Sequence, residues 1–229
     1  MRNKIYRVLR ESENFFKADM VYLAKGNLWK MSGQVITSIL SLGLMIMFAN
    51  LLPKETYGLY RYILSLAGIL SIFTLTGMNQ AIVQTVAAGN DGAFRTSIKY
   101  QLKWNLMQLL AFWSLGAYYF INNNQDLGTS LLVMGVFSPL TFVFNTYGAY
   151  LEGKKDFKLN SIFSVISTIV YVAGMAIAIK FSGETIWLVV AYSLTTFIST
   201  VILYVVTLRI FRPPVSPAND TLKYARELT

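Results

Sequence analysis

The sequence predicts an all-α, polytopic membrane protein with six transmembrane helices. The chain of 229 residues is 55% hydrophobic and only 14% charged, and its mean hydropathy is +0.49. That composition is too apolar for an ordinary water-soluble domain. Apolar stretches of about 20 residues, the length that a helix needs to cross a bilayer, recur along most of the chain. Short polar segments separate these stretches, so the bilayer is the predicted solvent.

Hydrophobic periodicity predicts helices over 28–50, 57–80, 100–121, 127–151, 158–180 and 185–209. Their connections are the polar segments "PKET", "NNNQD", "EGKKDF" and "SGE", and the longer "AAGNDGAFRTSIK". Residues 1–27 are interrupted by charges and are not a signal peptide; we expect a cytoplasmic amphipathic or flexible segment. Residues 211–229 are expected to form a cytoplasmic tail or a linker toward a missing second lobe.

The charges predict the orientation. Seventeen of the 20 Lys and Arg residues fall in the N-terminal segment, the C-terminal segment, or the connections on the same side of the membrane. The other side keeps only Lys54, Arg61 and Lys180. By the positive-inside rule, both termini are expected in the cytoplasm of a cell whose inner membrane holds the protein. The net charge of +9 therefore indicates basic cytoplasmic loops rather than nucleic-acid binding.

The residue types absent from the sequence restrict its chemistry. There is no cysteine and no histidine, which removes thiolate chemistry, the usual zinc ligands and the commonest general base. No nucleotide-binding signature is apparent either. We therefore expect no enzyme activity, no cofactor and no metal. The acidic residues all fall in or beside predicted loops, so no carboxylate is placed to couple transport to an ion gradient.

Polar residues recur at helical spacing on several predicted helices. The fifth helix carries Asn160, Ser164, Ser167, Thr168 and Tyr171, and the sixth Tyr192, Thr196 and Ser199. Shorter stripes lie on the first helix (Lys30, Gln34, Ser38, Ser41), the second (Arg61, Ser65, Gly68, Asn79) and the third (Gln101, Asn105, Gln108). Hydroxyls and small residues also serve close helix packing. Amides at membrane depth need partners or water, so the stripes predict a shared polar interior.

Arg61 has two interpretations. It lies about 6 Å along the helix from Tyr57, so its guanidinium can reach the outer headgroups. A cation facing the interior would cost about 2.5–3.5 kcal/mol at the bilayer centre and would need a compensating role. Spacing alone leaves both interpretations open.

Three motifs, in their order along the helices, carry a family resemblance. They are "ANLLPKETYGLY" between the first two helices, "GMNQAIVQ" at the end of the second, and "AYLEGKKDFKLNSI" between the fourth and fifth. From Ala24 onward the chain resembles the polysaccharide and O-antigen flippases of the multidrug/oligosaccharidyl-lipid/polysaccharide exporter superfamily. The resemblance implies one six-helix lobe of a two-lobed exporter, and a chain of six helices then corresponds to an N-terminal lobe.

The resemblance also implies a function. Such proteins move an undecaprenyl-diphosphate-linked oligosaccharide from the cytoplasmic to the outer leaflet, with membrane lipid, a second lobe or glycan-assembly proteins as partners. The hypothesis for the substrate-binding residues is that two cations contact the diphosphate and four amides line the sugar path: Arg61, Lys30, Gln34, Asn79, Asn105 and Asn160. For Lys30, an anchor at the membrane edge is the alternative.

Three other functions compete with this one. A multidrug exporter lobe would be favoured by an intramembrane carboxylate and a cavity without cations. A glycan polymerase or ligase would be favoured by a large outer loop with catalytic residues, and the predicted outer loops are only a few residues long. A non-transporting scaffold of a glycan-assembly complex also fits a chain of only six helices.

Overall fold

The computed structural model describes residues 20–75 and 77–215. These residues form helices and connections, with no strand among them. The helices are α2 (Met20–Leu51), α3 (Lys54–Leu70), the short 3-10 helix η1 (Ser71–Phe73), α4 (Met78–Ala87), α5 (Ala93–Ile121), α6 (Gln125–Phe144), α7 (Thr146–Gly153), α8 (Phe157–Phe181) and α9 (Thr185–Phe211). The predictions for residues 1–19 and 216–229 lie outside the described residues.

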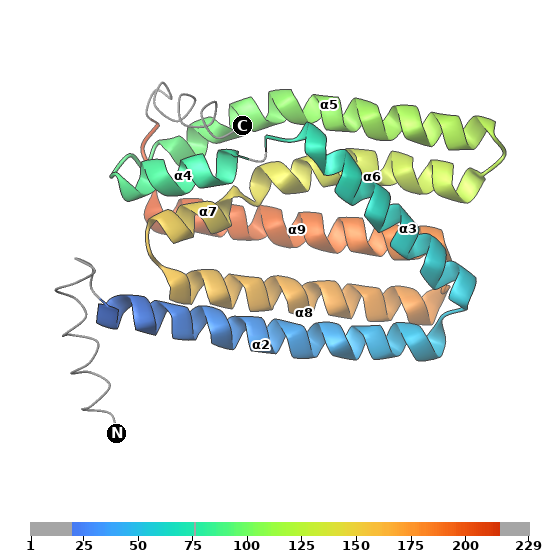
Figure 1. The fold of residues 1–229 in the computed structure, drawn as a ribbon, viewed down its shortest axis with the longest axis horizontal. Helices are drawn as coiled ribbons and strands as arrows, with labels where there is room; N and C mark the ends of the chain where they lie inside the picture. Colours follow the sequence, from blue (N-terminus) through green and yellow to red (C-terminus); the bar gives the residue numbers. More distant parts are fainter. Residues whose placement is uncertain (1–19, 76, 216–229) are drawn as a thin grey trace.

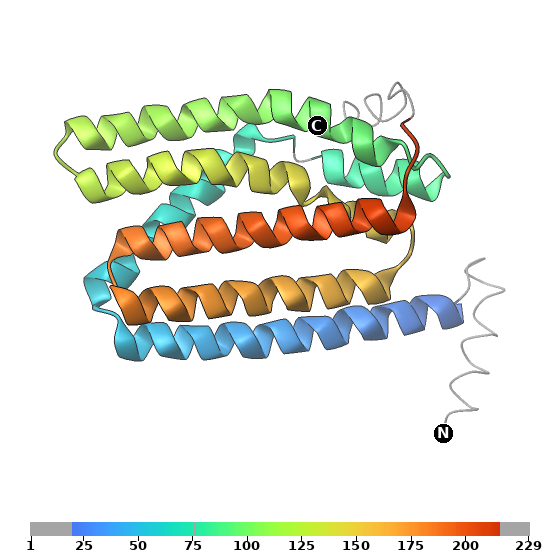
Figure 2. The ribbon, with the colours of Figure 1, turned by 180° about the vertical axis from the view of Figure 1, so that it is seen from behind.

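Five long helices lie side by side in the order α5, α6, α9, α8 and α2, and α3 crosses one face of this row obliquely (Figures 1 and 2). The short helices α4 and α7 pack against each other at the end of the bundle where α2 begins and α9 ends. The chain therefore enters and leaves the described bundle at the same end, as an even number of crossings requires.

Five helical segments are long and apolar enough to cross a membrane: Gly26–Leu51, Lys54–Phe73, Gln125–Gly153, Phe157–Phe181 and Thr185–Phe211. The third predicted span, 100–121, lies within α5, which runs beside α6 but is not one of the five. Cations and amides in the first half of α5, including Arg95, Lys99 and Gln101, lower its apolar character.

The fold corrects three of the predicted boundaries. The second predicted helix is not continuous over 57–80, because Thr74 is extended (φ −90°, ψ 160°) and the helix resumes only at Met78. β-Branched residues and a glycine in "TLTG" weaken a helix here. The fourth predicted helix is divided at Asn145 into α6 and α7. The long predicted loop is mostly helix, because α5 already begins at Ala93.

Glycines allow α5 and α6 to pack closely. A Cβ atom on Gly116 would lie 3.2 Å from the carbonyl oxygen of Gly128, and one on Gly128 would lie 3.1 Å from that of Gly116. A Cβ on Gly135 would lie 2.7 Å from Trp113 Cδ1 and 2.8 Å from Phe112 Cβ. Small residues of this kind are how membrane helices reach short separations.

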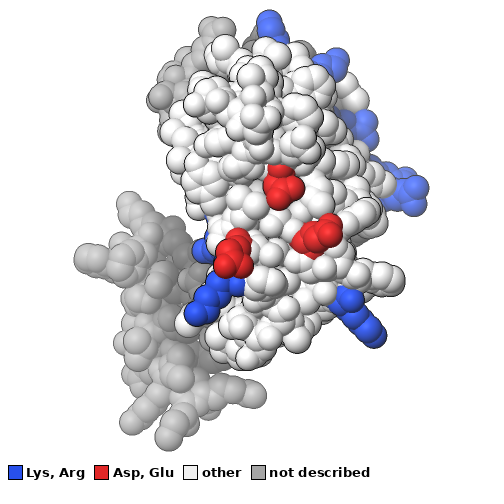
Figure 3. Space-filling model, turned by 90° about the vertical axis from the view of Figure 1, so that its right-hand side faces the viewer, with Lys and Arg blue, Asp and Glu red and all other residues white. Residues whose placement is uncertain are grey.

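Charge is distributed unequally between the two ends of the bundle. The end formed by the start of α2, the α4–α5 and α7–α8 connections and the end of α9 carries most described cations: Lys30, Arg95, Lys99, Lys103, Lys154, Lys155, Lys158, Arg209 and Arg212. We call this the cation-rich end. Figure 3 looks onto the opposite end, where a mostly uncharged surface carries the acidic residues Glu55, Asp126 and Glu184.

Candidate functional site

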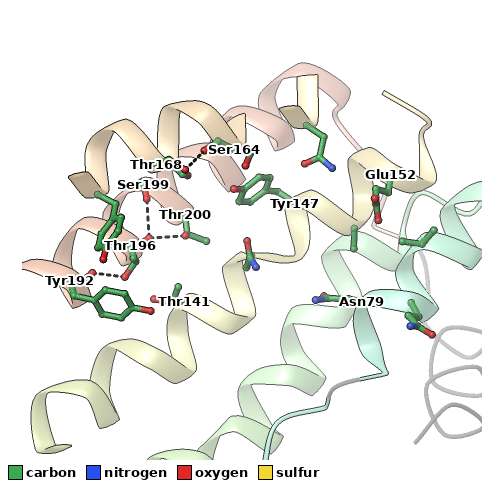
Figure 4. A pocket seen from close by; sticks show the side chains of 18 residues that line it. Asn79, Thr141, Tyr147, Glu152, Ser164, Thr168, Tyr192, Thr196, Ser199 and Thr200 are labelled. Carbon is green, nitrogen blue, oxygen red and sulfur yellow. Dashed lines mark hydrogen bonds between the residues drawn. The ribbon is translucent and has the colours of Figure 1, made fainter. Parts of the chain in front are cut away.

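A polar cavity of about 620 Å³ lies in the half of the bundle nearer the cation-rich end. Side chains from α4, α6, α7, α8 and α9, and from Asn145 between α6 and α7, surround it (Figure 4). Its lining residues are Asn79, Gln80, Val83, Thr141, Asn145, Tyr147, Gly148, Ala149, Glu152, Asn160, Ser164, Ser167, Thr168, Tyr171, Tyr192, Thr196, Ser199 and Thr200. Because Asn79, Gln80, Asn145 and Ser164 are exposed, the cavity is open to the surface.

The divided helices supply one wall of this cavity. The break after η1 places α4 against α7, and Gly153 of α7 makes their contact close. A Cβ atom on Gly153 would lie 2.7 Å from Val86 Cβ and 2.9 Å from the carbonyl oxygen of Val83. Asn79 on α4 and Glu152 on α7 thereby face the stripe of polar side chains on α8 and α9 (Figure 4).

The hydroxyl groups of the opposite wall mostly donate to their own helices. Thr168 donates to the carbonyl of Ser164 at 2.9 Å, and Thr196 to that of Tyr192 at 2.6 Å. Ser199 and Thr200 both donate to the carbonyl of Thr196 (Figure 4). A hydroxyl has one hydrogen and two lone pairs. Since the hydrogen is used by the backbone, these side chains offer acceptor lone pairs to the cavity.

Amides and one carboxylate complete the polar groups. Asn79, Gln80, Asn145 and Asn160 each bring both a donor and an acceptor. Glu152 is the one charged residue among the described residues that line the cavity. Its carboxylate forms an ion pair with the ammonium of Lys30 on α2. The wall is therefore polar and close to neutral.

Three tyrosines end the cavity toward the middle of the bundle. Tyr171 on α8 and Tyr192 on α9 line it, with ring centroids 5.7 Å apart and planes at 88°. Behind them lies Tyr60 of α3, fully buried, whose hydroxyl is 3.5 Å from that of Tyr171. Apolar packing by Phe48, Leu44, Ile63 and Met175 continues beyond Tyr60. The polar space therefore does not extend to the end of the bundle that carries Glu55 and Glu184.

A smaller pocket of about 200 Å³ adjoins the cavity, between α2 and α8. It is lined by Lys30, Gly33, Gln34, Asn160, Ser161 and Ser164, and it shares Asn160 and Ser164 with the cavity. The Lys30 ammonium also lies 5.0 Å from the ring centroid of Phe157. The two spaces together bring Lys30, Gln34, Asn79 and Asn160 into one region.

The remaining two predicted site residues lie elsewhere. Asn105 is buried between α5 and α6, outside the cavity, where its amide donates to the carbonyl of Pro139 at 2.8 Å. Its neighbours in the predicted stripe, Gln101 and Gln108, are buried as well. Arg61 is exposed on α3 and does not line the cavity, although its charge acts on the hydroxyl of Tyr171, which does.

One stripe was missed by the sequence reasoning. Thr141, Asn145, Gly148 and Glu152 are separated by four, three and four residues and all line the cavity. The helical spacing that identified the stripes on α8 and α9 applies equally here. Glu152 was instead assigned to a loop. The structure corrects this, because Glu152 belongs to α7 and faces the cavity.

Comparison with known families gives a match over residues 23–229, to the model described as "Polysaccharide biosynthesis protein". The chain belongs to the polysaccharide biosynthesis protein family. With its apolar helices, this makes the chain a multi-pass membrane protein of polysaccharide biosynthesis. For this polysaccharide biosynthesis protein, searches of curated proteins and of solved structures found no match.

Proposed function

We propose that the protein is a flippase that moves a lipid-linked oligosaccharide, attached through a diphosphate to undecaprenol, from the cytoplasmic to the outer leaflet. The observation that carries the proposal is a polar, nearly neutral cavity in a member of this family. An oligosaccharide is uncharged or weakly charged and rich in hydroxyl donors. The lone pairs of Thr168, Thr196 and Thr200 accept from such donors, and the amides of Asn79 and Asn160 serve both roles.

The charge distribution supports the direction of transport. With the cation-rich end in the cytoplasm of a cell with an inner membrane, as the positive-inside rule requires, the cavity opens in the cytoplasmic half. The three tyrosines then close it toward the outer leaflet. In this orientation α5 is the sixth crossing, and cargo enters beside Lys30 and Gln34. A diphosphate meets Lys30 first, and Arg61 is the proposed cation for its later position near the outer leaflet.

The open side of the cavity supports a second component. The side chains of Asn79, Gln80, Asn145 and Ser164 are exposed, and amides at membrane depth are costly without partners. A second lobe of the same architecture would enclose this polar wall, and alternation between inner and outer openings would then move the glycan. Glycan-assembly proteins are further candidate partners.

Glu152 provides the argument for the alternative, a multidrug exporter lobe. Such an exporter needs a free carboxylate to attract a cationic drug. Here the carboxylate is paired with Lys30, which neutralises it, so the cavity offers little to a cation. A glycan therefore fits the wall better.

A reconstituted transport assay tests the proposal. Proteoliposomes would contain the protein and a short glycan on polyprenyl diphosphate, and an added glycosidase would report arrival in the other leaflet. We expect Asn160→Leu and Asn79→Leu each to slow transport by about 3–10-fold, the effect of losing one or two hydrogen bonds to cargo.

Asn50→Leu is the matched control, because the Asn50 amide is exposed on α2 and donates only to the carbonyl of Ile46 in its own helix. Equal rates for all three variants would argue against the cavity as the glycan path. Glycan that stays in its original leaflet, even when a second lobe is reconstituted with folded protein, would contradict the function itself.

A further inference from the structure

A second pocket, of about 430 Å³, lies at the cation-rich end between the start of α2 and the α7–α8 connection. Its lining residues are Gly26, Trp29, Lys154, Lys155, Asp156, Phe157 and Lys158, none of which lines the polar cavity. We call it the lysine pocket. Three lysines and one aspartate line it, so the positive charge exceeds the negative.

Two of these charged groups are already engaged within the protein. Lys154 pairs with Asp91 of the α4–α5 connection at 2.5 Å. Asp156 accepts from the backbone N–H of Leu159 at 3.0 Å and so caps α8. The ammonium of Lys158 lies 5.2 Å from the ring centroid of Trp29, and the side chains of Lys155 and Lys158 are exposed. Lys155 and Lys158 are therefore the cations that the lysine pocket presents to solvent.

The backbone at Lys155 adds a second observation. Its φ of 60° lies in the left-handed region, which glycine adopts without cost and residues with a Cβ adopt rarely. Its N–H closes the turn after α7 by donating to the carbonyl of Glu152 at 2.9 Å. The turn itself would be better served by glycine. The lysine side chain at this position is explained by its charge rather than by the backbone.

The position of the lysine pocket matches the headgroup region of a membrane. Gly26 and Phe157 are the first residues of two apolar membrane-spanning segments, so the pocket lies where hydrocarbon gives way to headgroups. Trp29 at this depth is typical of membrane interfaces. On α2, Leu28 and Met31 are 64% and 66% exposed and provide an apolar surface beside the pocket.

We propose that the lysine pocket binds the phosphate group of a membrane lipid in the cytoplasmic leaflet. Lys155 and Lys158 would contact the phosphate oxygens, Trp29 would pack against the region between headgroup and chain, and Leu28 would contact the acyl or prenyl chain. Basic pockets between membrane helices on the cytoplasmic side recognise phosphate headgroups in this way. The lipid is either an anionic phospholipid or a polyprenyl diphosphate, since both carry the same recognised group.

Native mass spectrometry of the detergent-solubilised protein tests this without any transport step. Phosphatidylglycerol, phosphatidylcholine and undecaprenyl diphosphate would be titrated separately. Phosphatidylglycerol or undecaprenyl diphosphate is expected to bind more tightly than phosphatidylcholine. The double variant Lys155→Gln, Lys158→Gln should weaken that binding by about tenfold or more, at roughly fivefold for each cation removed.

The control double variant is Lys99→Gln, Lys103→Gln, which removes two exposed cations of α5 from the same end of the bundle. It should change binding by less than about twofold, the difference expected of charges outside the site. Equal loss in both double variants, or equal affinity for phosphatidylcholine, would overturn the proposal. Binding of undecaprenyl diphosphate alone would assign the lysine pocket to the cargo lipid, and binding of phosphatidylglycerol as well would assign it to anionic lipid generally.

Brominated lipids give a second measurement that reports position. With Trp104, Trp113 and Trp187 replaced by Phe, Trp29 is the remaining tryptophan of the chain. Brominated phosphatidylglycerol should quench its fluorescence at lower mole fraction than brominated phosphatidylcholine. Identical quenching curves would place the bound lipid elsewhere and contradict the assignment of the lysine pocket.

Discussion

The ammonium of Lys30 on α2 and the carboxylate of Glu152 on α7 form an ion pair between the polar cavity and the smaller pocket beside it. The two residues are 122 positions apart in the chain. Both side chains are partly exposed, at 40% and 37%. Their pairing joins the first helix of the described bundle to the divided fourth span, at the opening proposed for cargo.

Exchanging the two charges tests this pair. We expect Lys30→Gln and Glu152→Gln each to lower thermal stability in detergent, and the exchange Lys30→Glu, Glu152→Lys to recover part of the loss. For a solvated pair the coupling free energy should be about 0.2–1 kcal/mol and should shrink at high salt. A double-mutant cycle with no coupling at low salt would mean that the contact contributes nothing to stability.

Asn105→Leu separates a packing role from a substrate role. The variant removes the bond to the Pro139 carbonyl and leaves neighbouring buried polar groups in place, so stability should fall by about 1–3 kcal/mol. Transport per folded molecule should be unchanged, because Asn105 lies outside the cavity. The measurements are thermal unfolding and the proteoliposome assay at matched protein amount. Reduced transport with unchanged stability would instead favour the original assignment of Asn105 to the sugar path.

Gly135→Ala should disturb the contact between α5 and α6. The added methyl would lie 2.7 Å from Trp113 and 2.8 Å from Phe112, and relieving such overlap typically costs about 1–3 kcal/mol. Gly43→Ala is the matched control, since a Cβ there meets nothing within 4 Å. Unfolding monitored by tryptophan fluorescence compares the two. If both variants unfold at the same temperature, α5 and α6 are not as closely packed as their glycines indicate.

Single cysteines test whether the cavity is wet and which side it faces. The chain has no cysteine, so each introduced thiol is the sole reporter. Ser164→Cys in the cavity should react with a membrane-impermeant maleimide added from the cytoplasmic side. Leu42→Cys, on an exposed apolar face of α2, should stay unreactive because lipid covers it. Reaction of Ser164→Cys only from the outside would reverse the proposed orientation.

The sequence predicts the helices well because each crosses an apolar medium and must satisfy its own backbone. Stripes on α8 and α9 are predicted too, since helical spacing is a local property, and all eight of their residues line the cavity. The break at 74–77 is not predicted. It depends on the packing of α4 against α7, where Gly153 approaches Val86, and no local pattern reveals a contact between segments about 70 residues apart.

Asn105 and Glu152 show the limit for the site. A buried amide needs a partner, and the sequence does not say whether that partner is cargo or, as here, the carbonyl of Pro139 on the next helix. Glu152 follows an apolar run and precedes "GKKD", so it resembles a loop residue. Only the pairing with Lys30 shows that it faces the interior.

The hydroxyl hydrogens of Thr168, Thr196, Ser199 and Thr200 point along their own helices. A wall of fixed acceptors rewards any ligand that carries many donors and does not distinguish axial from equatorial hydroxyls. In a glycan flippase this would make the cavity permissive toward sugar identity. Cargo would then be sorted by its bulk and by its lipid-phosphate end, and one protein would tolerate changes in the repeating unit that its cell assembles.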